Sequence, residues 1–537
     1  MLTEEKEVKK YIAGLLAVIS ALCAVTACDS DKNKNKESSA ESSAVTVTTT
    51  AEVTTEPVST YPENPVSYPK IEQKESGVLC EAESCELKNG LRIAYDYDVF
   101  SGDGYVTGFG SDGRTSLTFN ADIPTNQHYD LSFSIASDTA AECEVLMGDS
   151  VIAEFTAKDG GEFTFITVYG IFLGKGKADI TIRPKNGEIS VDYLKITNST
   201  ALEKTDSKAS ETAVNENSAR SAQDIMKFLT ANYGKYVLTG QYAEDAENAE
   251  IELIYHTTGQ KPVIRFSELD ISDDGLDEDA DAAAEWYKNG GIPFVSWFWK
   301  APSDTKSSVY KKDTDFSLAD AFTEWDIAEL TQDEIRGLYN DGSITEECYR
   351  LILDIDSMAE KLSKLQEQGI PLMWRPIPEG SGGWYWWGAD GAWVYKWLWT
   401  LMHDRMTKLF GLDNLIWVWN GQSADTMPDK STFDIASADL YINDAKDYGS
   451  RFFESFAAVH KFVGDDKILG ISECGSVPDI DSSFRDNAVW SFFGLWNGKY
   501  IDDGKGGYSE KFTSKDALIK AYNSEGSLTL DEYREMK

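Results

Sequence analysis

The segment "PLMWRPIPEGSGGWYWWG", residues 371–388, reads as a buried strand that runs into a glycine-rich aromatic loop. Its first half is apolar around Arg375, and it ends at a single carboxylate, Glu379. In a barrel of parallel strands the carboxyl ends of the strands carry the chemistry. The segment therefore predicts a barrel strand with functional groups at its end.

Seven other apolar runs extend this pattern along the chain, with amphipathic helical intervals such as residues 356–369 between them. The runs are residues 236–242, 261–270, 292–299, 414–421, 433–441, 468–475 and 489–496. Eight strands alternating with helices predict an α/β fold, specifically a (β/α)8 TIM barrel over residues 219–525. A doubly wound open sheet is the alternative.

Residues 76–198 have a different pattern, with short alternating runs such as "TSLTFNADI" separated by Gly, Asp and Asn turns. Such a pattern is typical of an all-β domain, a jelly-roll or sandwich. A polar linker is expected over residues 199–218, and residues 526–537 are expected to form a short C-terminal tail.

The N-terminus carries targeting signals. Residues 11–27 form an apolar run after two lysines, which predicts a signal peptide over residues 1–27. The run ends in "VTAC", which resembles the lipobox of bacterial lipoproteins and implies a lipid-modified Cys28, so we expect a protein anchored at the surface of a bacterium. An ordinary cleaved signal is the alternative. Residues 28–75 are rich in Ser and Thr and predict a disordered stalk.

Composition limits the possible partners. With 91 acidic and 50 basic residues the formal charge is -41, which disfavours nucleic acid and anionic membrane surfaces and suits neutral polymers. The four histidines are scattered and no Cys/His spacing suits zinc, so no catalytic cofactor is expected. The oligomeric state is left open.

Two glutamates, Glu379 and Glu473, lie at the predicted ends of the fourth and seventh strands. Such a pair suits glycoside hydrolysis, in which one carboxyl group protonates the leaving oxygen and the other attacks the anomeric carbon. Burial among aromatic rings would keep Glu379 protonated as the acid. Glu473 fits the nucleophile, with Arg375 and Tyr441 placed to hydrogen-bond it.

Aromatic side chains at the other strand ends predict a sugar-binding wall, because sugars present flat C–H faces as well as hydroxyl edges. About half of such rings are expected only to pack loops onto the barrel rim. The candidate substrate-binding residues are Trp299, Arg375, Trp384, Trp387, Trp419, Tyr441 and Trp496.

These motifs resemble glycoside hydrolase family 26, a family of retaining (β/α)8 enzymes whose best-known members are endo-β-1,4-mannanases. The matching pieces are "SWFWKAP", "WRPIPEGSGGWYWWG", "NLIWVWNGQ", "ADLY" and "ISECG". The resemblance implies that Glu379 is the acid/base, that Glu473 is the nucleophile and that a β-mannan is the substrate.

Two positions depart from the family pattern. Family members commonly have His directly before the acid/base and within a "WHW" motif, where this chain has Pro378 and Phe298. These departures keep three alternatives open: a related β-glycanase acting on xylan or mixed-linkage glucan, a non-catalytic surface glycan-binding protein, and a structural surface-layer protein.

The predicted sandwich resembles carbohydrate-binding module family 35 through "CEAES", "GYVTGFGSDG" and "VDYLKI". The resemblance implies that Glu81, Glu83 and Asp192 hold a structural Ca²⁺, for which carboxylate oxygens are suitable ligands. At spacing i, i+2 on one strand, Glu81 and Glu83 would lie on the same face.

Overall fold

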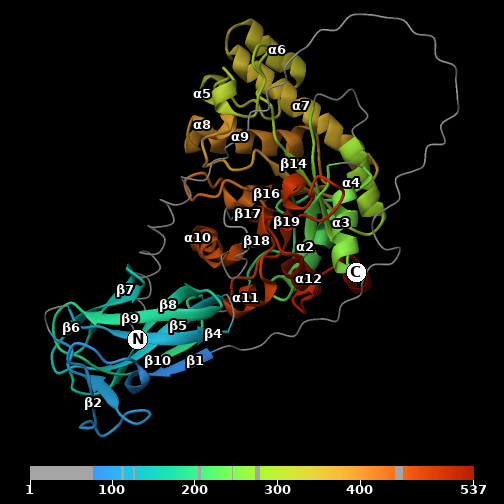
Figure 1. The fold of residues 1–537 in the computed structure, drawn as a ribbon. Coiled ribbons are helices and arrows are strands. Elements are labelled where there is room, and N and C mark those ends of the chain that lie inside the picture. The colour runs from blue at the N-terminus through green and yellow to red at the C-terminus, as the bar shows by residue number, and fades with distance from the viewer. Residues whose placement is uncertain are drawn as a thin grey trace, which may run out of the picture. The chain divides into compact units, whose positions relative to one another are not determined.

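The computed structural model describes residues 77–110, 114–124, 127–202, 207–244, 246–271, 278–441 and 452–537. The predicted signal peptide, the stalk and Cys28 lie outside these residues. Figure 1 shows strands of the sandwich in blue to green and the barrel elements in green to red. Among the described residues, no helix combines the length and the apolar character needed to cross a membrane.

Ten strands form the N-terminal all-β domain. They are β1 (Gly77–Glu81), β2 (Arg92–Ala94), β3 (Tyr105–Thr107), β4 (Leu117–Ile123), β5 (Gln127–Ala136), β6 (Ala141–Met147), β7 (Ser150–Ala157), β8 (Thr164–Leu173), β9 (Gly176–Pro184) and β10 (Ser190–Asn198). One sheet has the order β2-β3-β10-β5-β8, with β1 also paired to β10, and the other has the order β4-β9-β6-β7. Alternation along β4 buries Leu117 and Phe119 while leaving Asn120 exposed. The expected sandwich is confirmed.

Eight parallel strands close into the predicted barrel in sequence order, which rules out the open sheet. The strands are β12 (Gly240–Tyr242), β13 (Ile264–Glu268), β14 (Ile292–Trp297), β15 (Leu372–Pro376), β16 (Leu415–Trp419), β17 (Ile435–Leu440), β18 (Ile468–Cys474) and β19 (Phe493–Leu495). Between and around them lie α3 (Ala249–Thr258), α4 (Glu278–Lys288), α5 (Leu318–Ala321), α6 (Gln332–Asn340), α7 (Glu346–Glu367), α8 (Trp386–Ala389), α9 (Ala392–Asp404), α10 (Phe453–Val463), α11 (Ile480–Arg485) and α12 (Lys515–Asn523).

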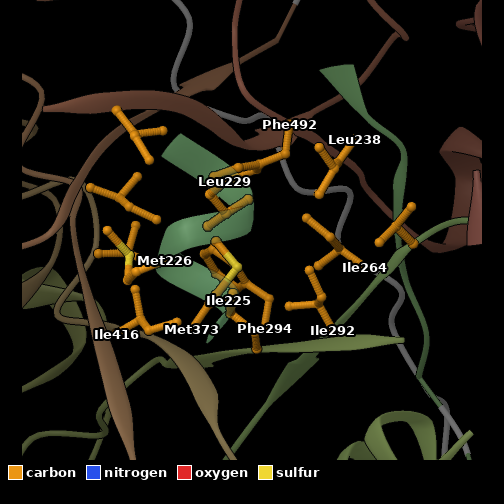
Figure 2. Packing of buried hydrophobic residues seen from close by; sticks show 14 of the residues in the cluster. Ile225, Met226, Leu229, Leu238, Ile264, Ile292, Phe294, Met373, Ile416 and Phe492 are labelled. Carbon is orange, nitrogen blue, oxygen red and sulfur yellow. The ribbon is translucent and has the colours of Figure 1, made fainter. Parts of the chain in front are cut away.

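The amino end of the barrel is closed by α2 (Arg220–Asn232), which precedes the first barrel strand. Ile225, Met226 and Leu229 of this helix join one buried cluster with residues at the strand starts, such as Ile292 and Ile416 (Figure 2). Since apolar packing fills this end, polar chemistry is left to the opposite end, where the strands terminate.

The C-terminal residues, expected to be a short tail, pack as part of the barrel domain. Strand β20 (Ser527–Leu528) pairs in parallel with β11 (Val237–Leu238), and α13 (Leu530–Met536) follows it. Leu528 and Tyr533 belong to the buried cluster that also contains the side chains of α2. The apolar spacing in "SLTLDEY" is the sequence signal that accounts for this packing.

Candidate active site

Arg375, at the end of β15, is a fully buried hub at the carboxyl end of the barrel. Its Nη1 donates to Glu473 Oε1 at 2.6 Å, and its Nη2 donates to a carboxylate oxygen of Asp439. Nη2 also donates to Asn420 Oδ1 at 3.1 Å, and Nη1 donates to the Tyr242 hydroxyl at 3.1 Å. The guanidinium group thus links five barrel strands, because its partners come from β12, β17 and β18 and from the loop after β16.

Glu473, on β18, is nearly buried and its carboxylate has donors on both oxygens. Arg375 occupies Oε1, and the hydroxyl of Tyr441, just after β17, donates to Oε2 at 2.7 Å. Burial raises the pKa of Tyr441 well above its usual value, and the Glu473 charge adds to the effect. Tyr441 therefore remains a donor, and the arrangement stabilises Glu473 in its ionised form.

Glu379 lies three residues beyond β15 in a constrained loop. Its φ is +52°, and its backbone N–H donates to both Asn420 O (2.7 Å) and Asn420 Oδ1 (2.8 Å). A positive φ at a residue with a side chain is unfavourable and is typical of functional sites, where the surrounding structure imposes it. Asn420 supplies that constraint.

The carboxyl group of Glu379 has an unusual acidity. Burial raises its pKa to about 7, and the Glu473 charge contributes, while the Arg375 charge and a hydrogen bond from Trp384 act in the opposite direction. Trp384 Nε1 donates to Glu379 Oε2 at 2.9 Å. One carboxylate held ionised beside another that retains its proton near neutral pH is the division of roles that acid-assisted displacement requires.

The structure separates the predicted aromatic wall into two groups. Trp384 is 38% exposed, and Trp496 is partly exposed with its ring centroid 4.4 Å from that of Tyr242. Trp299, Trp387 and Trp419 are completely buried, so they are packing residues and do not contact substrate.

These buried indoles hold the loops beneath the site. Trp299 Nε1 donates to Asp354 Oδ2 at 2.7 Å, and Trp387 Nε1 donates to the Pro378 carbonyl at 2.7 Å. The Trp387 bond fixes the residue directly before Glu379. The prediction that these indoles bind sugar therefore fails because their polar edges serve loop geometry.

The two positions that depart from the family pattern also flank this hub. Phe298 is partly exposed, and the Arg375 guanidinium carbon lies 5.7 Å from the centroid of its ring. The Phe298 ring meets Tyr385 and Trp496 edge-on at 6.0 and 6.3 Å. An apolar ring therefore stands in the cleft wall where an imidazole would offer hydrogen bonds.

Several polar members of the site were not among the predicted residues. Asp439 and Tyr242 contact Arg375 directly, and Glu268, at the end of β13, is a third carboxyl group near Glu473. Burial and the Glu473 charge raise the pKa of Glu268 to about 7. Asp439 precedes Tyr441 in "ADLY", so its position near a strand end was the signal available.

In the sandwich, the three predicted calcium ligands gather at one loop. Ser101 donates to both Asp192 and Glu81, and Asp103 N donates to Glu83 Oε1 at 2.8 Å. Glu81 ends β1, but Glu83 lies in a 3-10 turn, so the expected shared strand face is wrong.

This cluster has unused acceptors. Glu81 Oε2 and Glu83 Oε2 are buried oxygens without a hydrogen-bond donor. Within the described residues, however, no three His, Cys, Asp or Glu side chains form a ready metal-binding group. The donor chemistry fits Ca²⁺, while the side chains do not already form a coordination shell.

Comparison with known proteins gives consistent matches. Residues 214–515 match glycosyl hydrolase family 26, and residues 78–199 match carbohydrate binding module family 35. Mannan endo-1,4-beta-mannosidase A from Piromyces sp is 30% identical over 471 residues, which cover 85% of this chain and 72% of that protein. A mannan endo-1,4-beta-mannosidase from Thermothelomyces thermophilus is 28% identical, with 86% and 92% covered.

Among solved structures, a GH26-CBM35 β-(1,4)-mannanase from Podospora anserina superimposes with a TM-score of 0.67 at 27% identity. The superposition covers 86% of this chain and all of that one, and so includes both a catalytic and a carbohydrate-binding domain.

Proposed function

Because the chain belongs to glycosyl hydrolase family 26 and is a glycoside hydrolase, we propose that it cleaves internal β-1,4-mannosidic bonds of mannan, galactomannan or glucomannan with retention of configuration. The observation that carries the proposal is the contrast between Glu473, held by Arg375 and Tyr441, and Glu379, whose pKa is raised to about 7. The family 35 module at residues 78–199 would hold the polysaccharide.

The two glutamates would act in two steps. A Glu473 oxygen attacks the anomeric carbon while Glu379 gives its proton to the glycosidic oxygen, so the carbon–oxygen bond breaks and a glycosyl-enzyme ester forms. Glu379, now ionised, takes a proton from water as the water oxygen attacks the same carbon. The ester bond breaks, Glu473 leaves as a carboxylate, and two inversions give net retention.

A second candidate is a β-glycanase acting on xylan or mixed-linkage glucan. Phe298 favours it, because an apolar ring beside Arg375 provides no hydrogen bond to select a sugar hydroxyl. A panel of mannan, glucomannan, xylan and mixed-linkage glucan distinguishes the two candidates by the reducing ends that are released.

The same panel tests the proposal as a whole. We expect the highest kcat/KM on mannans, internal cleavage of mannohexaose, and a β-configured new reducing end in early proton NMR spectra. Preference for xylan or glucan would replace the substrate assignment. Binding to mannan gels without any hydrolysis would identify a non-catalytic glycan-binding protein.

The pH profile gives a specific prediction for Glu379. The acid works while protonated, so kcat/KM should fall as the pH rises through about 7. The Trp384 hydrogen bond favours the ionised form, so Trp384→Phe should raise the pKa of Glu379 and move this basic limb to higher pH.

Glu268→Gln is the control, because the pKa of Glu268 is also raised to about 7. The basic limb should remain in that variant. A limb that disappears in Glu268→Gln and does not move in Trp384→Phe would show that Glu379 is not the titrating acid.

We also propose that Glu81, Glu83 and Asp192 hold a structural Ca²⁺ in the sandwich. The two buried oxygens without donors support it, as does Gly102, where an added Cβ would lie 2.1 Å from Glu83 Oε1. Bound Ca²⁺ would neutralise the charges that Glu81 and Glu83 impose on Asp192. Its role would be to fix the loop at residues 101–103.

Removing calcium should therefore destabilise the sandwich. At Ca²⁺ about 100-fold above its Kd, the expected stabilisation is about 2.7 kcal/mol, seen by calorimetry as a higher unfolding temperature than in chelator. The double variant Glu81→Gln/Glu83→Gln should lose this response, and the exposed Glu162→Gln should keep it. A Ca²⁺ response that survives the double variant would contradict the assignment.

The lipobox resemblance supports a further proposal, that Cys28 carries a lipid that anchors the enzyme at a bacterial surface. Fractionation of cells that produce the full chain tests it, since Cys28→Ser should move the enzyme from the membrane fraction to another fraction.

A further inference from the structure

The loop that follows β14 runs beside the aromatic loop that follows β15. Tyr310 and Tyr385 form an antiparallel bridge, flanked by hydrogen bonds from Lys311 N to Trp384 O (2.8 Å) and from Trp386 N to Val309 O (3.1 Å). In a pair with this bonding pattern the two residues face each other without bonding directly, and their side chains approach most closely.

The bridge produces a continuous aromatic stack. The centroid of the Tyr310 ring lies 5.5 Å from that of Tyr385, with 28° between the planes, and Tyr385 lies 4.6 Å from Trp387 at 23°. Trp387 is fully buried, whereas Tyr310 is 45% exposed. The stack thus starts in the protein interior and ends with a Tyr310 ring whose face opposite Tyr385 is available to solvent.

This stack lies next to Glu379. Trp384, whose backbone accepts the Lys311 hydrogen bond, donates its indole N–H to Glu379 Oε2 at 2.9 Å and is 38% exposed. Burial raises the pKa of Tyr385 above its usual value, and the Glu379 charge contributes more to that rise than the Glu473 charge. The aromatic groups therefore flank the acid, and the nucleophile is more distant.

Position beside the acid gives the stack a direction along the substrate. The group that protonates the glycosidic oxygen lies next to the departing sugar, while the nucleophile lies under the sugar that stays. An exposed ring supported from behind on the acid side is suited to the C–H face of a departing sugar. At the rim, Lys312 Nζ lies 5.8 Å from the centroid of the Tyr310 ring and could donate to a hydroxyl group.

We propose that Tyr310 forms a leaving-group subsite, beyond the sugar at Trp384, that stacks against a neutral β-linked hexose unit of the substrate. The proposal rests on the proposed function and adds a specificity-determining residue to it. In a retaining enzyme the same subsite receives an acceptor sugar when a sugar hydroxyl replaces water in the second step. Tyr310 should therefore also promote transglycosylation.

The test compares Tyr310→Ala with Tyr310→Phe, which keeps the ring. On mannohexaose, Tyr310→Ala should lower kcat/KM about tenfold, shift cleavage towards the opposite end of the chain and reduce transglycosylation products. Tyr310→Phe should retain near wild-type values. On an aryl mannobioside, whose leaving group is too short to reach Tyr310, both variants should match the wild type.

Tyr339→Ala is the matched control, since Tyr339 stacks on Tyr349 at 4.7 Å on α6 and α7, on elements that carry none of the residues of the site. It should leave the product pattern unchanged. Wild-type mannohexaose kinetics and products in Tyr310→Ala would overturn the proposal, and so would an equal loss on the aryl substrate. Failure of the wild-type enzyme on every mannan would instead overturn the proposed function.

Discussion

Replacing Glu473 with alanine is expected to lower the rate of mannan hydrolysis by about four orders of magnitude or more. Without this carboxylate the anomeric carbon has no partner for the covalent step. Azide should restore turnover and yield an α-mannosyl azide, because the small anion attacks from the face that Glu473 has vacated. Initial rates with and without azide, and the configuration of the product, provide the measurement.

Glu379→Ala should behave differently, because its role depends on the leaving group. Polysaccharide hydrolysis should fall by about 10²- to 10⁴-fold, while formation of the glycosyl-enzyme from a dinitrophenyl mannobioside needs no acid and should survive. Glu360→Ala, an exposed glutamate on α7, is the control and should leave both rates unchanged. Substantial mannan hydrolysis by either catalytic variant would sink the two-glutamate assignment.

Both glutamates were predictable because a parallel barrel brings the ends of its strands together, so position in sequence translates into position in space. Glu473 ends β18 within its strand, as the apolar run before it predicts. Glu379 was found by the same argument although it lies in a loop with positive φ. The strand before it is what places it.

The aromatic residues were harder to place from sequence, since a tryptophan near a strand end fits a cleft wall and a buried loop support equally well. Trp384 and Trp387 are three positions apart in one glycine-rich loop, yet one is 38% exposed and the other is fully buried. The direction of each ring depends on partners distant in sequence, such as Val309 and Tyr310, which pair with this loop. Such partners follow from tertiary pairing alone.

Asp439 shows a related limit of sequence reasoning. A carboxylate one residue inside a strand end reads as either a surface acid or an ion-pair partner, and its contact with Arg375 depends on the register shift between Ala438 and Asp439. A bulge of this kind re-aims a side chain without an obvious sequence marker. The hub around Arg375 therefore became visible only in three dimensions.

Arg375→Met is expected to damage both catalysis and stability. The substitution preserves much of the volume but leaves Glu473 and Asp439 as two buried carboxylates without their shared cation, a change that typically costs about 3–5 kcal/mol. The two carboxylates could not both stay ionised near neutral pH, so the nucleophile would be partly lost and kcat should fall at least about 100-fold. The Arg375 charge also opposes the raised pKa of Glu379, so the basic limb should move to higher pH.

Arg405→Met separates the catalytic effect from the structural one. Arg405 is also fully buried, and its guanidinium group binds both oxygens of Asp356, with Nη2 donating to Oδ2 at 2.8 Å, outside the active site. It should lose stability to a similar extent in urea unfolding while its folded fraction keeps the wild-type pH profile. If Arg375→Met lost stability but kept kcat and both limbs of the profile, Arg375 would be a structural ion-pair residue, and the ionised state of Glu473 would need another source.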